Sequence, residues 1–174
     1  IARCWPAAVA VPADADDVSV LVAWAKRTGA ALVPRGSGSG MAAGAVGPGV
    51  VVDLSRLDTM GAVDVEARRI RVGTGALRGA VDKAARPHGL RFPVDPSSGA
   101  FCTIGGMVAA NAAGVRTLKF GATRPWVQGV RCVFDDGSDV WVHRDLPLPL
   151  QVPAVGGREG PPAQIAGGGP TGRR

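Results

Sequence analysis

The sequence predicts an α+β fold for residues 1–144, and three observations lead to this class. Apolar residues recur at helical spacing between Asp14 and Gly29. Short valine-rich runs bounded by Gly and Pro predict β-strands. An Asp136-Gly137 pair between two apolar runs is typical of a β-hairpin. With 174 residues and 46% hydrophobic content, the chain is large enough for one domain with its own core.

The first predicted helix has clear boundaries, because acidic residues follow Asp14 and basic residues precede Gly29. A small-residue helix is predicted over 103–113, where the Thr103 side chain can cap it. The remaining predicted elements are strands at 30–33, 50–54, 69–73, 130–134 and 140–143 and a helix at 77–86. The order from residue 14 is therefore helix, strand, glycine-rich loop, strand.

Residues 145–174 differ in composition from the rest of the chain. They are rich in Pro, Gly, Arg and Ala and have almost no aromatic or periodic apolar residues. Such a segment buries too little apolar surface to offset the entropy of ordering. We expect a disordered tail, in which Gly156-Gly157-Arg158 is an accidental glycine pair because Pro161-Pro162 follows it.

Charge and cysteine content limit the class of protein. The net charge of +6 suits an acidic partner such as a phosphate-bearing ligand, a nucleic acid or an anionic surface. Nucleic-acid binding is disfavoured by the absence of Tyr and of a basic stripe, although it stays open as an alternative. Three widely spaced cysteines indicate neither a metal site nor a disulfide framework, which favours a cytoplasmic setting. No apolar run predicts a membrane span.

One candidate binding segment is the glycine-rich loop that begins at Pro34. Successive glycines let neighbouring backbone N–H groups point toward one anion, and Ser37 and Ser39 add hydroxyl donors. The loop is neither a Walker A motif nor a Rossmann fingerprint, since the spacing differs from both. Taken alone, a loop of this composition is more often a plain connector.

A second candidate segment extends from Pro93 to Gly114. Its prolines stiffen an extended approach, and Gly105-Gly106 at a helix start would let a flat ligand lie against bare backbone. The alternative is a close packing contact of the helix, preceded by a turn. Neither segment alone decides between ligand binding and packing.

Together, the motifs resemble those of FAD-linked oxidases of the glycolate oxidase and D-lactate dehydrogenase kind. The resemblance covers roughly residues 6–142 and is carried by several motifs in order and spacing. These are the loop 34–45, Val51-Val52-Asp53-Leu54-Ser55, Asp95-Pro96-Ser97-Ser98, Cys102-Thr103-Ile104-Gly105-Gly106-Met107, Asn111-Ala112-Ala113-Gly114, Leu118-Lys119-Phe120-Gly121 and Asp136-Gly137.

The resemblance implies the FAD-binding PCMH-type domain of the vanillyl-alcohol oxidase and p-cresol methylhydroxylase group. In that domain the glycine loop holds the diphosphate, and the second segment runs past the flavin ring and ribityl chain. The residues that it assigns to FAD are Arg35, Gly36, Ser37, Gly38, Ser39, Gly40, Met41, Pro93, Asp95, Ser98, Thr103, Ile104, Gly105, Gly106, Asn111, Gly114, Gly121 and Val130.

The resemblance also implies the chemistry, which is flavin-dependent oxidation of a 2-hydroxy acid such as glycolate or D-lactate, with a possible electron-transfer partner subunit. Ser39 stands where some relatives carry a flavin-linked His, so no covalent bond is expected there, and Cys102 is expected to be a thiol. His88 and His143 are interpreted as ordinary surface histidines. No catalytic residue is assigned, because family members continue into further strands and a substrate-binding cap domain.

We therefore expect only the N-terminal subdomain and the start of the second, with the C-terminal part of the domain missing. Two alternatives to an FAD-binding oxidoreductase stay open at this point. One is a truncated remnant that does not bind FAD stably, because unpaired sheet edges and an uncovered cofactor face are liabilities. The other is a basic protein that binds a nucleic acid or an anionic surface.

Overall fold

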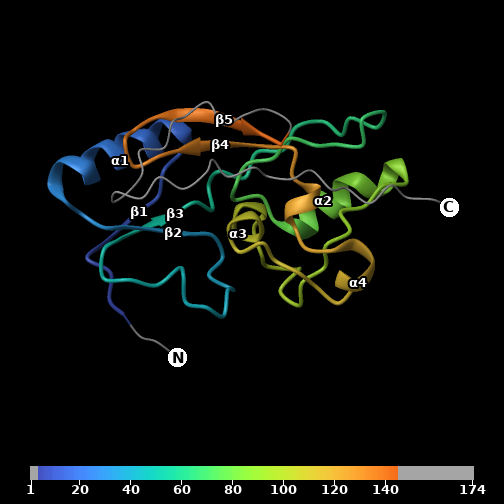
Figure 1. The fold of residues 1–174 in the computed structure, drawn as a ribbon, viewed down its shortest axis with the longest axis horizontal. Helices are drawn as coiled ribbons and strands as arrows, with labels where there is room; N and C mark the ends of the chain where they lie inside the picture. Colours follow the sequence, from blue (N-terminus) through green and yellow to red (C-terminus); the bar gives the residue numbers. More distant parts are fainter. Residues whose placement is uncertain (1–3, 145–174) are drawn as a thin grey trace, which may run out of the picture.

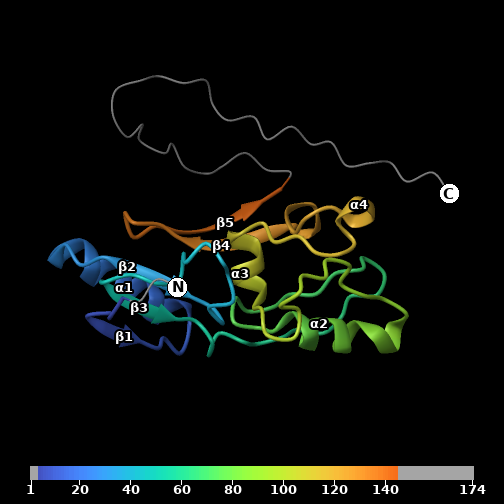
Figure 2. The ribbon, with the colours of Figure 1, turned by 90° about the horizontal axis from the view of Figure 1, so that it is seen from below.

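The computed structural model describes residues 4–144, which form two small sheets with helices around and between them (Figure 1). Figure 2 shows the parallel sheet and α2 on one side, the β4–β5 hairpin on the other, and α3 between them. The elements are β1 (Ala8–Ala10), α1 (Ala15–Thr28), β2 (Leu32–Arg35), β3 (Val50–Asp53), α2 (Arg78–Ala85), η1 (Arg86–His88), α3 (Ile104–Ala109), α4 (Thr117–Phe120), η2 (Arg124–Trp126), β4 (Gly129–Val133) and β5 (Asp139–His143).

The first sheet is parallel, with β3 in the centre and the order β1-β3-β2. Val50, Val51 and Val52 of β3 are all buried, as expected for a central strand covered on both faces. The parallel arrangement brings the carboxyl ends of β2 and β3 together, with Arg35 in register with Asp53. The predicted strands at 30–33 and 50–54 are confirmed, although β2 begins at Leu32, while β1 has no counterpart in the sequence prediction.

Helix α1 connects β1 to β2 and begins and ends where the sequence predicts. The Asp14 carboxylate caps it by accepting hydrogen bonds from the N–H groups of Asp16 and Asp17 at 3.0 and 2.9 Å. Gly29 ends it in the left-handed conformation, with φ of 70°. Helix α1 thereby returns the chain to the start of β2, beside β3.

The second half of the chain builds its core around α3. Val94, Cys102 and Met107 form a buried cluster, against which Phe92, Ile104 and Ala112 pack. Thr103 caps α3 as predicted, because its Oγ1 accepts a hydrogen bond from the N–H of Gly106 at 3.2 Å. The helix is shorter than the predicted 103–113, since it ends at Ala109.

The β4–β5 hairpin confirms the prediction from Asp136-Gly137, with Val130 paired to Val142. It lies along α1 (Figure 1), to which two contacts connect it. Arg131 reaches Asp16 at 3.4 Å, and the Lys26 Nζ donates to the Asp136 carbonyl at 3.5 Å. Both contacts are exposed, so each adds little to stability.

The predicted strand at 69–73 is wrong. Residues 60–72 form only isolated antiparallel bridges, Met60 with Val72 and Asp64 with Arg69, around a turn. Alternation of apolar residues predicted a strand there, and residues 59–64 do pair with it, but the register shifts by one residue between the two bridges, so no continuous ladder forms. The predicted tail at 145–174 lies outside the described residues. Within 4–144, no helix has the length and apolar character needed to cross a bilayer.

The contrast between two methionines tests the packing of the second half. Met107 is 1% exposed in the core cluster, whereas Met41 is fully exposed. Met107→Ala should lower the free energy of unfolding by about 2–5 kcal/mol, because it leaves a cavity. Met41→Ala should change it by less than about 0.5 kcal/mol. Urea denaturation of both variants makes the comparison, and equal effects would contradict this description of the core.

Candidate functional site

The site begins where β2 and β3 end, at Arg35 and Asp53. The Asp53 carboxylate accepts a hydrogen bond from the Ser55 N–H at 2.9 Å. That bond, with the Ser55 hydroxyl and the nearby charge of Arg35, lowers the pKa of Asp53 below its ordinary value. A carboxylate and a guanidinium of opposite charge thus mark the carboxyl edge of the sheet, the edge at which parallel sheets commonly bind ligands.

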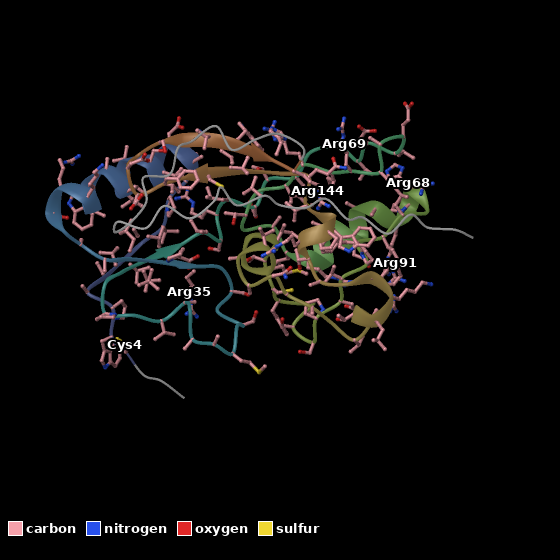
Figure 3. All side chains as sticks on the ribbon, in the orientation of Figure 1. Cys4, Arg35, Arg68, Arg69, Arg91 and Arg144 are labelled. Atoms are coloured by element: carbon pink, nitrogen blue, oxygen red, sulfur yellow. The ribbon has the colours of Figure 1, made fainter. Side chains whose placement is uncertain are left out.

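The glycine loop wraps around the head of Arg35. The Arg35 guanidinium donates to the carbonyl of Ala45 at 3.2 Å, near the end of the loop. On its other side it lies against Gly38, where an added Cβ would come within 2.2 Å of the guanidinium. Gly38 also has φ of 69°, a conformation that L side chains rarely adopt. Arg35, labelled in Figure 3, therefore contacts the loop both at Gly38 and at Ala45.

The loop offers backbone donors for an anion. Among the described residues, the backbone N–H groups of residues 36–44 donate no hydrogen bond to the chain itself. Residues 37–44 are exposed, so their free N–H groups, which follow the cation of Arg35, are open to solvent and to an external acceptor. These donors together with Arg35 fit the diphosphate of a dinucleotide such as FAD.

The two segments singled out in the sequence meet at Gly36 and Thr103. A Cβ on Gly36 would lie 2.3 Å from the Thr103 Oγ1, a distance that no folded protein accommodates without movement. Thr103 is buried and caps α3. Bare backbone at position 36 is thus what allows the glycine loop to reach the start of α3. Ser37 and Gly105 lie one and two residues from this contact.

A third segment, residues 74–76, lies beside this contact and is absent from the sequence prediction of the site. The Ile104 N–H donates to the Ala76 carbonyl and the Gly105 N–H to the Thr74 carbonyl, both at 2.8 Å. Thr74 also fills the space beside Gly105, because a Cβ there would lie 1.6 Å from the Thr74 Oγ1. The bare backbone of Gly105 therefore serves a packing contact, which is the alternative that the sequence left open.

Asp95 connects the middle of the second segment to its end. Its carbonyl accepts from the Val115 N–H at 3.3 Å, and a Cβ on Gly114 would lie 2.0 Å from the same carbonyl oxygen. Asn111 has φ of 45°, and its Oδ1 accepts from the Arg124 N–H at 2.9 Å. Asp95 and Gly114, two of the residues assigned to FAD by the resemblance, are thus in direct contact.

Other predicted site residues lie farther from these contacts. Met41 is fully exposed, and nothing lies within 4 Å of a Cβ placed on Gly40. Gly121 follows α4, with φ of 70°, and Val130 lies half-buried in β4. No hydrogen bond among the described residues connects Gly121 or Val130 to the glycine loop, and their assignment stays a prediction. Pro93, Ser98, Ile104 and Gly106 belong to the segment around α3.

The structure also contains a hollow of about 290 Å³ on the sheet side of Arg35. Cys4 and Arg35, both labelled in Figure 3, contribute to its lining. Its other walls come from Pro6, Val9, Ala45, Val46, Gly47, Val51 and Asp53. The hollow shares Arg35 with the predicted cofactor contacts and includes none of residues 36–41.

The reactive side chains of the chain are placed apart from one another. Cys102 is buried in the core cluster, and burial raises the pKa of its thiol above the ordinary value. The thiol form is therefore favoured at neutral pH. His88 and His143 are exposed, and His143 stacks on Trp141 with ring centroids 6.0 Å apart. Within residues 4–144, no cluster of His, Cys, Asp or Glu could hold a metal ion.

Comparison with known proteins gives one matching family and several similar enzymes. Residues 6–143 match the family described as FAD binding domain. The D-2-hydroxyglutarate dehydrogenase of Xanthomonas citri pv. viticola is 37% identical over 135 residues, 76% of this chain and 29% of that protein. The D-lactate dehydrogenase of Archaeoglobus fulgidus is 35% identical over 74% of this chain and 29% of its own length.

A further relative is the glycolate oxidase subunit GlcD of Escherichia coli K12, 37% identical over 70% of this chain and 25% of its own length. Among solved structures, 6-hydroxy-D-nicotine oxidase from Arthrobacter nicotinovorans superposes with a TM-score of 0.69 at 25% identity, over 79% of this chain and 30% of its own. An alkyldihydroxyacetonephosphate synthase reaches 0.70 at 23% identity, covering 81% and 27%, which shows the fold alone. The chain spans under a third of each relative.

Two glycine substitutions test the contact between the segments. Gly36→Ala should destabilise the chain by about 1–3 kcal/mol, because the new methyl group collides with Thr103. Gly40→Ala should cost less than about 0.5 kcal/mol, since the space beside it is open. Thermal unfolding of both variants provides the measurement. In a chain that already carries Thr103→Ala, Gly36→Ala should cost less than it does in the wild-type chain. Equal tolerance of Gly36→Ala and Gly40→Ala would refute the contact.

Cysteine labelling tests the environment of Cys102. We expect a disulfide reagent to modify exposed Cys4 in the folded chain well before Cys102. Because burial raises the pKa of Cys102, its thiolate fraction should begin to rise only at a pH above the ordinary range for a thiol. Mass spectrometry of labelled peptides across a pH series separates the sites. Rapid labelling of Cys102 at neutral pH would overturn the placement.

Proposed function

The chain belongs to the FAD binding domain family, and from that membership we propose that its glycine loop and its segment 93–114 hold FAD for the oxidation of a 2-hydroxy acid. The observation that carries the proposal is the contact of Gly36 with Thr103, next to free backbone donors and Arg35. It supports one shared binding region for the two segments. FAD supplies the electron-accepting chemistry when bound, and the protein supplies its orientation.

The loop is the proposed diphosphate site. Arg35 contributes the positive charge, and the N–H groups that follow Gly36 contribute neutral donors. Charge-assisted hydrogen bonds of this kind are roughly twice as strong as neutral ones. Ser37 and Ser39, whose hydroxyls lie 3.3 Å apart, provide further donors at the same place. The net charge of +6 is in keeping with an anionic cofactor.

The second segment is the proposed flavin-facing wall. Its residues Asp95, Thr103 and Gly114 are held by contacts within the chain, so the wall is formed before any ligand arrives. A preformed wall lowers the ordering cost of binding. Gly105 supports this wall by packing on Thr74 rather than by exposing backbone to the ring.

The proposed substrate class comes from the relatives. Their names state D-2-hydroxyglutarate, D-lactate and glycolate, which share a hydroxyl group on the carbon beside a carboxylate. We propose the same class for the protein of which these residues are the FAD-binding part. Neither exposed histidine is proposed as the base, and an electron-transfer partner subunit and a cytoplasmic setting stay predictions.

The direct test is the colour of the purified chain after incubation with FAD. We expect a yellow protein that retains flavin on gel filtration and quenches or shifts flavin fluorescence in a saturable titration. Glycolate, D-lactate and D-2-hydroxyglutarate should then be compared as reductants of the bound flavin under anaerobic conditions. A chain that is folded by circular dichroism but stays colourless would contradict the proposal and favour the truncated remnant.

A matched pair of glycines makes the test specific to the loop. Gly38 and Gly89 both have φ of 69°, so alanine strains the backbone equally at both positions. Only at Gly38 does the new methyl group also displace the Arg35 guanidinium. Gly38→Ala should raise the FAD dissociation constant about tenfold or more, equivalent to about 1.4 kcal/mol. Gly89→Ala should leave it within about twofold, and similar losses in both variants would contradict a diphosphate site at the loop.

A further inference from the structure

Arg78 is a buried cation outside every motif that predicted the site. Its side chain is 11% exposed, at the first position of α2. A buried guanidinium is costly unless each donor finds an acceptor, so the identity of its acceptors shows what it holds in place. Among the described residues, all of its acceptors lie in residues 92–95, where the second segment begins.

The guanidinium contacts three acceptors within four consecutive residues. Its Nε donates to the Val94 carbonyl at 3.1 Å, and a terminal nitrogen donates to the Phe92 carbonyl at 3.3 Å. The same terminal group forms an ion pair with the Asp95 carboxylate at 3.2 Å. Only the planar, forked guanidinium presents donors in this arrangement, since an ammonium is a single point.

The backbone of Arg78 holds the other end of the same segment. Its N–H donates to the Cys102 carbonyl at 3.0 Å, and the neighbouring Leu77 pairs with Thr103. One residue thus fastens residues 92–95 through its side chain and residue 102 through its main chain. The stretch between them, with Ser98 and Gly99 at its turn, is a closed loop whose two ends meet on α2.

Asp82 completes the attachment one helical turn later. Its side chain is 4% exposed, and its Oδ1 accepts from the Phe92 N–H at 3.3 Å. Its Oδ2 accepts from the Nε and a terminal nitrogen of Arg86, at 3.1 and 3.0 Å. Arg86 is 74% exposed and contacts only Asp82 in this network. It therefore offers a control at the residue that directly follows α2.

We propose that Arg78 is a positioning residue for the bound flavin, because it sets the geometry of the flavin-facing loop 92–103 without contacting the cofactor. The inference rests on the proposed function. Asp95 transmits the effect, since its carbonyl lies against Gly114 and accepts from Val115. Loss of the guanidinium loosens the loop and displaces Asp95 and Gly114 together.

The experiment compares Arg78→Lys with Arg86→Gln in the full chain. Arg78→Lys keeps the charge but loses the fork, whereas Arg86→Gln removes an exposed partner of Asp82. In Arg78→Lys we expect the FAD dissociation constant to rise about tenfold or more, because at least one charged hydrogen bond is lost. The visible circular dichroism of the bound flavin should change. Arg86→Gln should keep both within about twofold.

A measurement without FAD tests separately whether Arg78 holds the loop 92–103 in place. Cys102 is buried at the end of the loop, so its labelling by a thiol reagent reports whether the loop is held. It should accelerate about tenfold or more in Arg78→Lys, for the same loss of hydrogen bonding, and stay unchanged in Arg86→Gln. If Arg78→Lys fails to fold, Asp95→Asn decides, with weaker FAD binding and an altered flavin spectrum expected.

The outcomes differ for the two proposals. A wild-type chain that stays colourless overturns the proposed function, and this inference falls with it. A yellow wild type with an Arg78→Lys variant of unchanged affinity and spectrum overturns the inference alone, whether or not Cys102 labelling accelerates. If Arg78→Lys does not fold, an Asp95→Asn variant with wild-type FAD affinity and flavin spectrum also overturns the inference alone.

Discussion

The site depends on the absence of a side chain at position 36. Gly36 lies where β2 ends, and the hydroxyl of Thr103 occupies the volume that any other residue would need. Thr103 is itself constrained, because it is buried, caps α3 and pairs with Leu77. The end of β2 and the start of α3 are therefore in contact at Gly36 and Thr103, and the position of Thr103 is fixed by the rest of the fold. The free donors of the glycine loop start from this point and are presented beside it.

Two arginines, one half-buried and one buried, organise the two walls of the site. Arg35 is half-buried, and the glycine loop folds around its head from Gly38 to Ala45. Arg78 is buried, and the second segment is fastened to it at both ends. In each case a guanidinium replaces the regular hydrogen bonding that a loop lacks, because it donates to carbonyls that no strand or helix satisfies. The walls are built on side chains rather than on secondary structure.

The relatives explain why so much chemistry is absent from this stretch. Each is three or more times as long as the matched region, and their names describe acids that must be bound as well as oxidised. The described residues provide a cation, backbone donors and a preformed wall, all suited to a cofactor. Among them the two histidines are exposed and Cys102 is buried as a thiol. These features support the proposed role of the described residues in holding FAD.

The sequence by itself determined the local elements and the two glycine segments. Helix α1, the cap at Thr103 and the Asp136-Gly137 hairpin follow from short-range rules, since capping and turn chemistry depend on residues a few positions apart. Local alternation misled at 69–73, because the antiparallel pairing with residues 59–64 changes register between its two bridges, which the local pattern does not show. The motif spacing also led to the family, which residues 6–143 confirm.

Only the tertiary structure decided how the segments meet. No pattern in the sequence assigns Thr74 to the space beside Gly105 or Arg78 to the loop 92–103, because these contacts join residues distant along the chain. A glycine in the sequence looks the same whether a ligand or a neighbouring side chain fills the space beside it. The fold distinguishes the two, since it alone places the neighbouring atoms: Gly36 and Gly105 face side chains, while Gly40 faces open space.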